Sequence, residues 1–201
     1  MVDENRVREL YVEYNTVIKP LIAEVEARME QFPLPIFNEI RALHDHISRC
    51  YSDNITDAQI EKELEKGKRH VVRIILDCYK YLNLSLHDSI LLFEKQTKNI
   101  DLTVLQDGTF YPQYKSLRTK AIQTVRKAKN IEARDRDTAL DVYQESYNIY
   151  TSLENLIDGV VPDLHWARVR FRIRKSWKVV LWILSAVLSG VVSIFLADLF
   201  S

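Results

Sequence analysis

The chain has 201 residues, enough for one domain of ordinary size and a short additional segment. Its formal net charge is zero, but six of its 28 basic residues and only one of its 28 acids follow His165, which leaves 22 basic and 27 acidic residues before that point. A net-acidic domain is not typical of a phosphate-binding surface, so this composition argues against a general nucleic-acid-binding protein.

Signals for compartment and redox chemistry are few. The opening residues MVDENRVREL contain no apolar run of the kind that a secretory signal peptide needs. Cys50 and Cys78 lie within helical patterns and lack the spacing of a metal or redox motif. We expect two buried, reduced thiols in a cytoplasmic domain.

Glycine and proline are sparse before residue 179, which predicts long helices. Residues 3–32 keep a helical apolar spacing with an expected kink at Pro20, and the Pro-Leu-Pro run at 33–35 ends that helix. A helix over about 36–51 follows. A capping box at 56–59 then begins a long helix that reaches about residue 97. The sequence does not decide whether this helix bends or breaks near residues 83–85.

Residues 99–112 are the most loop-like part of the chain, and two further helices are expected over about 113–133 and 136–157. No run outside 168–178 alternates as a strand. The prediction is therefore an all-α fold, with a cytoplasmic bundle of about five helices over residues 1–160 and one C-terminal transmembrane helix.

The segment RVRFRIRKSWK alternates cations with apolar residues, which on its own could indicate a strand with a nucleic-acid-binding face. Placed on a helix, its apolar residues gather on one side. We therefore expect residues 161–178 to form a basic amphipathic helix beside a membrane, with anionic lipid headgroups as partners. The six cations of this collar are Arg168, Arg170, Arg172, Arg174, Lys175 and Lys178.

Residues 179–197 carry no charge and, at 1.5 Å per residue, would span about 28 Å, close to the roughly 30 Å hydrocarbon core. We expect a tail anchor over 179–201 that leaves the rest of the chain in the cytoplasm. The interfacial aromatic residues would be Trp166, Trp177 and Trp182.

Small residues recur every three or four positions along this segment, a spacing that lets membrane helices approach closely and favours a homo-oligomer. The alternative is that small residues are simply common in membrane helices. The expected helix-association face consists of Ser185, Ala186, Ser189, Gly190 and Ser193.

The run NEIRALHDHISR contains Arg41 and His46 with four residues between them. A histidine can move a proton and an arginine can stabilise phosphorane-like charge, so this pair could cleave RNA without a metal. At this point the sequence resembles the HEPN superfamily of small helical bundles, over about residues 36–157. The resemblance implies Arg41 and His46 as the catalytic pair of a composite site formed by a dimer. Family nucleases usually have a polar residue after the arginine, and here it is Ala42. The alternative to a catalytic site is a solvent-exposed helix face on which Arg41 and Asp45 form an i,i+4 ion pair.

No metal or cofactor is expected, since His44 and His46 are two positions apart and cannot share one ion as an i,i+4 pair would. Three functions stay open. The first is a non-enzymatic membrane effector or accessory protein that binds an unidentified cytoplasmic protein partner. The resemblance implies a role in anti-phage defence and a location at a bacterial inner membrane. The second is a membrane-tethered, metal-independent ribonuclease, for which RNA is the substrate. The third is a tail-anchored scaffold.

Overall fold

The computed structural model describes the backbone of residues 4–199, and the side chains of that range except those of 175, 178 and 190–199. Its described residues form helices and turns, without a strand, and the predicted all-α class is confirmed. In chain order the helical elements are α1 (Glu4–Glu13), η1 (Tyr14–Ile18), α2 (Lys19–Arg28), α3 (Leu34–Arg49), α4 (Asp57–Thr97), η2 (Leu102–Gly108), α5 (Phe110–Glu132), α6 (Arg136–Asp158), η3 (Val161–Asp163) and α7 (Leu164–Leu199).

The helix boundaries follow local chemistry. The expected kink at Pro20 takes the form of a π-helical turn, η1, just before it, because proline has no N–H to bond the carbonyl four residues back. Thr56 and Gln59 form the predicted capping box: the Thr56 N–H donates to Gln59 Oε1 at 2.8 Å, and the Gln59 N–H donates to Thr56 Oγ1 at 3.3 Å. The helix α4 continues through residues 83–85 without a break.

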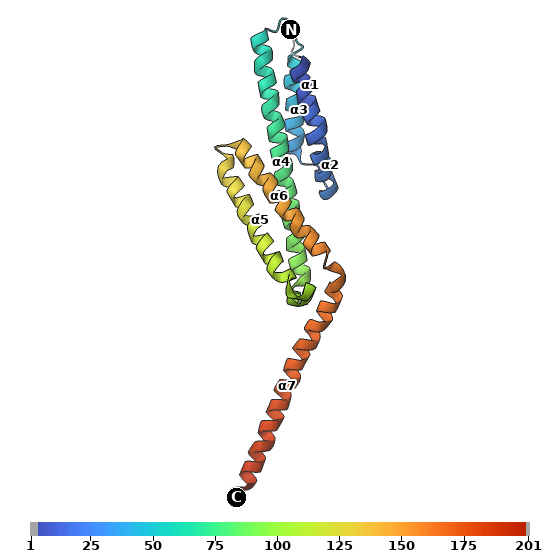
Figure 1. Ribbon diagram of the computed structural model, residues 1–201, viewed down its shortest axis with the longest axis vertical. Helices are drawn as coiled ribbons and strands as arrows, with labels where there is room; N and C mark the ends of the chain where they lie inside the picture. The colour runs from blue at the N-terminus through green and yellow to red at the C-terminus, as the bar shows by residue number, and fades with distance from the viewer. Residues whose placement is uncertain (1–3, 200–201) are drawn as a thin grey trace. The chain divides into compact units, whose positions relative to one another are not determined.

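The chain divides into two compact units. The first contains residues up to 92 together with 115–155, so it holds α1, α2, α3, most of α4, and most of α5 and α6. Within it, α1 and α2 lie along α3 and α4, while α5 and α6 form a hairpin beside α4 (Figure 1). A continuous apolar core joins these helices, with Ile18, Val25, Ile36, Leu43 and Leu82 completely buried.

The second unit contains residues 93–114 and the chain from 156 onward. The aromatic rings of Phe93, Phe110 and Tyr114 pack together, with centroids 5.7 to 6.2 Å apart. The expected loop at 99–112 contains the 3-10 turn η2, and the backbone takes positive φ at Gln106, Asp107 and Gly108. The start of α7 contacts η2 and η3.

The residues 164–199 form one helix, so the alternating segment at 168–178 is helical and not a strand. The prediction of a transmembrane tail anchor at 179–201, and with it the single-pass location at a bacterial inner membrane, is wrong: within the described part of the chain, no helix combines the length and the apolar character that a membrane crossing requires. The first half of α7 carries the collar arginines. The side chains after residue 189 lie outside the described residues.

Candidate functional site: a groove between α4, α5 and α6

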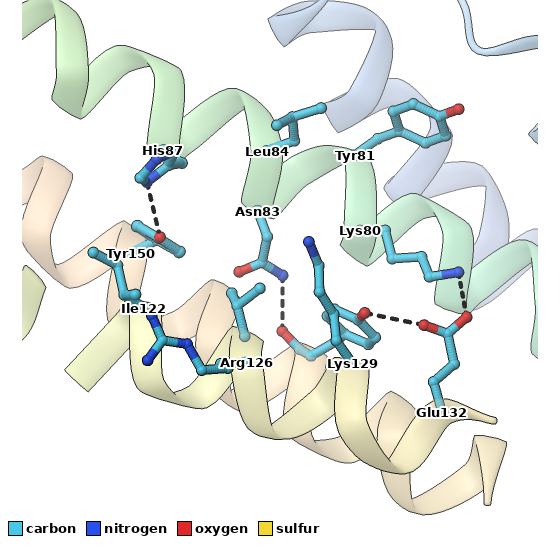
Figure 2. Close-up of a pocket in the computed structure, with 12 residues that line it drawn as sticks. Lys80, Tyr81, Asn83, Leu84, His87, Ile122, Arg126, Lys129, Glu132 and Tyr150 are labelled. Atoms are coloured by element: carbon cyan, nitrogen blue, oxygen red, sulfur yellow. Dashed lines mark hydrogen bonds and ion pairs between the residues drawn. The ribbon is translucent and has the colours of Figure 1, made fainter. Parts of the chain in front are cut away.

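A groove with a cavity volume of about 680 Å³ lies between α4 and α5, with α6 as its third wall, inside the first unit (Figure 2). This volume is in the range of small-molecule binding sites. Its surface is mostly apolar. The lining residues are Lys80, Tyr81, Asn83, Leu84, His87, Ile122, Val125, Arg126, Lys129, Glu132, Tyr143 and Tyr150.

Asn83 is a buried polar residue in the wall of this groove, with only 3% of its surface exposed. Its amide nitrogen Nδ2 donates two hydrogen bonds, to the Tyr79 carbonyl oxygen at 2.7 Å and to the Tyr143 carbonyl oxygen at 3.0 Å. Because both acceptors are carbonyls, they require the nitrogen on this side and fix the orientation of the amide. The oxygen Oδ1 has no hydrogen-bond partner among the described residues. A buried acceptor without a partner is costly, and few are found in folded proteins.

Glu132 is the acidic residue of the groove, and its two carboxylate oxygens are already engaged. Lys80 donates to Oε1 at 2.5 Å, and the Tyr143 hydroxyl donates to Oε2 at 3.0 Å (Figure 2). Lys80 also pairs with Asp77 at 3.2 Å. Burial raises the pKa of Tyr143, so its hydroxyl keeps the proton that it donates. These contacts tie α4, α5 and α6 together at one end of the groove.

Arg126 and Lys129 stand three residues apart on α5, on the same side of the helix, and both are exposed. Figure 2 shows Lys129 extending from α5 toward α4, and Asn83 projecting from α4 in the opposite direction. Neither cation has a carboxylate partner within the described residues. In contrast to Lys80, they are two uncompensated positive charges at the edge of an apolar groove.

His87 follows Asn83 by one helical turn and lies on the same side of α4. Its ring nitrogen Nδ1 is 3.2 Å from the Tyr150 hydroxyl on α6 (Figure 2). Burial raises the pKa of Tyr150, so the phenol is neutral at physiological pH. This pair closes the other end of the groove with polar groups that bond to each other.

The candidate catalytic residues of the sequence lie elsewhere. His46 faces α4, where its Nδ1 is 2.6 Å from Glu63 and its ring stacks on His70 with centroids 5.0 Å apart. His70 in turn lies 2.5 Å from Glu39. Arg41 is exposed, and the described residues offer it no ion pair.

Arg41 and His46 therefore do not meet within one chain. They are five residues apart on the unbroken helix α3, which places them about 140° apart around its axis. The alternative pairing of Arg41 with Asp45 is also not observed, since Asp45 pairs with Arg49 at 2.5 Å. A ribonuclease site would need a second copy of the chain, and it stays a prediction.

The collar arginines at 168, 170, 172 and 174 are exposed on α7. Within the second unit, Arg174 forms an ion pair with Asp101 at 2.9 Å, which connects α7 to the turn before η2. Arg170 lies over the Trp166 ring, with its guanidinium carbon 5.1 Å from the ring centroid. Lys175 and Lys178 have side chains outside the described residues.

The other features expected on α7 are exposed where they are described. Trp166, Trp177 and Trp182 have exposed fractions of 51%, 60% and 71%. Ser185 Oγ donates to the Trp182 carbonyl at 2.8 Å and Ser189 Oγ to the Ala186 carbonyl at 3.0 Å, both within the same helix. The remaining members of the helix-association face, Gly190 and Ser193, lie outside the described side chains.

The groove was not predicted from the sequence. Residues 83–85 were noted as a place where α4 could bend, whereas Asn83 lies in an unbroken helix between the buried Leu82 and Leu86. A polar residue within an apolar helical pattern was the available signal. The spacing of Arg126 and Lys129 on α5 was a second signal, but no pattern of neighbouring residues shows that α5 packs against α4.

Comparisons with known proteins leave the chain without an assigned family: neither a protein-family model, nor a curated protein, nor a solved structure matches it. The resemblance to HEPN bundles therefore stays a prediction. Among the described residues, no group of three or more His, Cys, Asp and Glu side chains is placed to hold a metal ion.

Proposed function

We propose that this chain is a non-enzymatic binding module that holds a small organic anion in the groove between α4, α5 and α6. The observation that carries the proposal is the position of Arg126 and Lys129 at the edge of a mostly apolar groove, where the described residues provide neither cation with a carboxylate partner. The other cation of the groove, Lys80, is balanced by Asp77 and Glu132.

The chemistry of the groove defines what it would bind. Apolar side chains such as Leu84, Ile122 and Val125 favour a flat or aliphatic body, because its burial removes apolar surface from water. Two uncompensated cations favour a phosphate, sulfonate or carboxylate on that body, through charge-assisted hydrogen bonds. A ligand with both parts would be recognised better than either part alone.

Such a module would respond to its ligand through the three helices that form the groove, and this extends the expectation of a domain that senses a partner. A role as an accessory protein in anti-phage defence, which the HEPN-like resemblance implies, would make the ligand a signal that the module detects. A plain scaffold would not need the groove.

The proposal is tested with 1-naphthyl phosphate, a probe that has a flat apolar body and one phosphate, titrated into the full chain by isothermal calorimetry. We expect saturable binding with one site per chain. Changing both Arg126→Glu and Lys129→Glu should weaken binding by at least tenfold, because the probe's phosphate then meets two negative charges.

The matched control is Lys120→Glu with Lys127→Glu. These lysines are exposed on the same helix and do not line the groove, so the change in net charge is identical. The control should bind the probe within about twofold of the unmodified chain. An absence of saturable binding, or an equal loss in both double variants, would overturn the proposed function.

A further inference from the structure

We infer that one side of α7 docks on an anionic lipid surface, with the helix lying along the headgroups and not crossing them. The part of α7 that carries this inference is an apolar stripe in the second unit, whereas the groove belongs to the first. The inference therefore goes beyond the proposed function and does not depend on it. The apolar stripe consists of Trp166, Val169, Ile173, Trp177 and Val180.

The apolar stripe is a side of α7 that the described chain leaves uncovered. At about 100° per residue its five members lie within about 80° of the helix circumference. Each of them is between 41% and 60% exposed. Ala167 is completely buried and Phe171 is half-buried on another side of the helix, and the start of α7 contacts η2 and η3. The helix is therefore packed on one side and apolar but exposed on another.

Arginines flank the apolar stripe, and no acidic residue accompanies them. Arg170 lies at one edge of the stripe, and Arg168 and Arg172 lie beyond the other. Among the four collar arginines whose side chains are described, Arg174 alone has a carboxylate partner. The sequence contains no Asp or Glu from 164 to 197. Charge complementarity therefore favours an anionic partner for this side of α7.

The charge pattern argues against a second copy of α7 as this partner, because two such helices would bring like charges together. An acidic helix of another protein would cover one side of α7 only. The apolar exposure continues around the whole helix beyond the stripe: the consecutive residues Leu181, Trp182 and Ile183 point about 100° apart and are 59%, 71% and 49% exposed. A fluid lipid surface adapts to such a shape, as a rigid partner helix does not.

The residue types of the stripe and its flanks also favour lipid. Tryptophan is enriched where headgroups meet acyl chains, because its ring is apolar and its N–H is polar. Arginine can place its guanidinium among lipid phosphates while its methylene groups stay against apolar surface. Trp166 and Trp177 lie near the two ends of the stripe, and the guanidinium of Arg170 already lies over the Trp166 ring, 5.1 Å from its centroid.

The test uses the full chain with two kinds of vesicle, one of phosphatidylcholine alone and one of equal parts phosphatidylcholine and phosphatidylglycerol. All three tryptophans of the chain are on α7, so their fluorescence reports on this helix. We expect their emission to move to shorter wavelength with the anionic vesicles. Co-sedimentation should show at least tenfold tighter binding to these vesicles than to phosphatidylcholine at about 0.1 M salt, and release at about 1 M salt, where charges are screened.

The double variant Arg168→Glu with Arg172→Glu should bind the anionic vesicles at least tenfold more weakly. Lys95→Glu with Lys98→Glu is its matched control, because both lysines are exposed in the second unit, lie outside α7 and give the same change in net charge. This control should bind within about twofold of the unmodified chain. Far-ultraviolet circular dichroism checks that all variants keep their helices.

Four outcomes would overturn the inference. They are no association with the anionic vesicles, equal affinity for both kinds of vesicle, an equal loss of binding in both double variants, and a chain that stays on the vesicles at about 1 M salt. A fluorescence shift that an acidic amphipathic peptide produces and the vesicles do not would also overturn it, in favour of a protein partner.

Discussion

Glu63 lies between α3 and α4 and is held there by hydrogen bonds from Lys66 and from His46, the latter at 2.6 Å. These two contacts lower the pKa of the Glu63 carboxyl from 4.5 to about 2. The folded state therefore binds a proton at Glu63 less readily than the unfolded chain does. His70 and Glu39 form a second pair beside it, so each of the two stacked histidines has its own carboxylate.

Because folding lowers the pKa of Glu63, its ionised form stabilises the folded state. A carboxyl whose pKa is lowered on folding contributes stability above its unfolded value of about 4.5, and loses that contribution as the pH falls toward 2. We expect the free energy of unfolding to fall as the pH is lowered from 5 to 3. The change Glu63→Gln should remove part of this fall, because the glutamine does not titrate.

The measurement is urea unfolding of both proteins at pH 6, 5, 4 and 3. The exposed Glu9→Gln serves as the control, and it should follow the unmodified chain at each pH. The difference between Glu63→Gln and the unmodified chain should be largest at pH 6 and should shrink at pH 3. A difference that is constant with pH would show that Glu63 stabilises the fold by packing alone.

At the scale of elements, α4 is the helix on which the first unit is assembled. Its N-terminal half contacts α1 and α3, and its middle carries the residues of the groove. Gly67 lies where these helices approach: a Cβ built there would be 3.4 Å from the Leu10 side chain on α1 and 3.5 Å from that of Leu43 on α3. Such distances leave room for a methyl group and for little more.

Gly67 is inside a long helix, where glycine is less stable than alanine by roughly 0.5–1 kcal/mol. We expect Gly67→Ala to raise the free energy of unfolding by about that amount, since the added methyl makes ordinary contacts. In contrast, Gly67→Leu should lower it by about 1–3 kcal/mol, because the larger side chain must displace Leu10 or Leu43. Thermal and urea unfolding of the two variants test this, and a destabilised alanine variant would contradict the expectation that the methyl group makes only ordinary contacts.

At the scale of the whole molecule, the placement of Arg41 and His46 bears on whether the chain is an enzyme. One chain does not bring them together, since Arg41 is exposed and His46 is engaged by Glu63. We expect the purified chain to leave single-stranded RNA intact in the presence of a metal chelator, as a binding module would. RNA cleavage that is lost in both Arg41→Ala and His46→Ala would contradict this and would support a composite site formed by two copies.

The sequence predicted the helices of this molecule better than it predicted the candidate site. The ends of α3, α4, α5 and α6 were predicted within a few residues. Prolines, the capping box and Gly108 begin or end a helix through contacts within a single turn, so their effect can be read from the sequence. The prediction of a tail anchor was wrong. It depended on the uncharged run at 179–197, whereas no helix in the described part of the chain is long and apolar enough to cross a membrane.

The sequence by itself determined the secondary structure and the amphipathic faces, because both follow from residues a few positions apart. Only the tertiary structure decided which polar groups meet. Asn83 and the Tyr143 carbonyl are 60 residues apart, and His87 and Tyr150 are 63 apart, so no local pattern could pair them. The same holds for His46, which the sequence grouped with Arg41 and which the packing of α3 on α4 instead places against Glu63 and His70. The helices form through interactions between residues that are close in the sequence. The groove forms only when α5 and α6 fold back along α4.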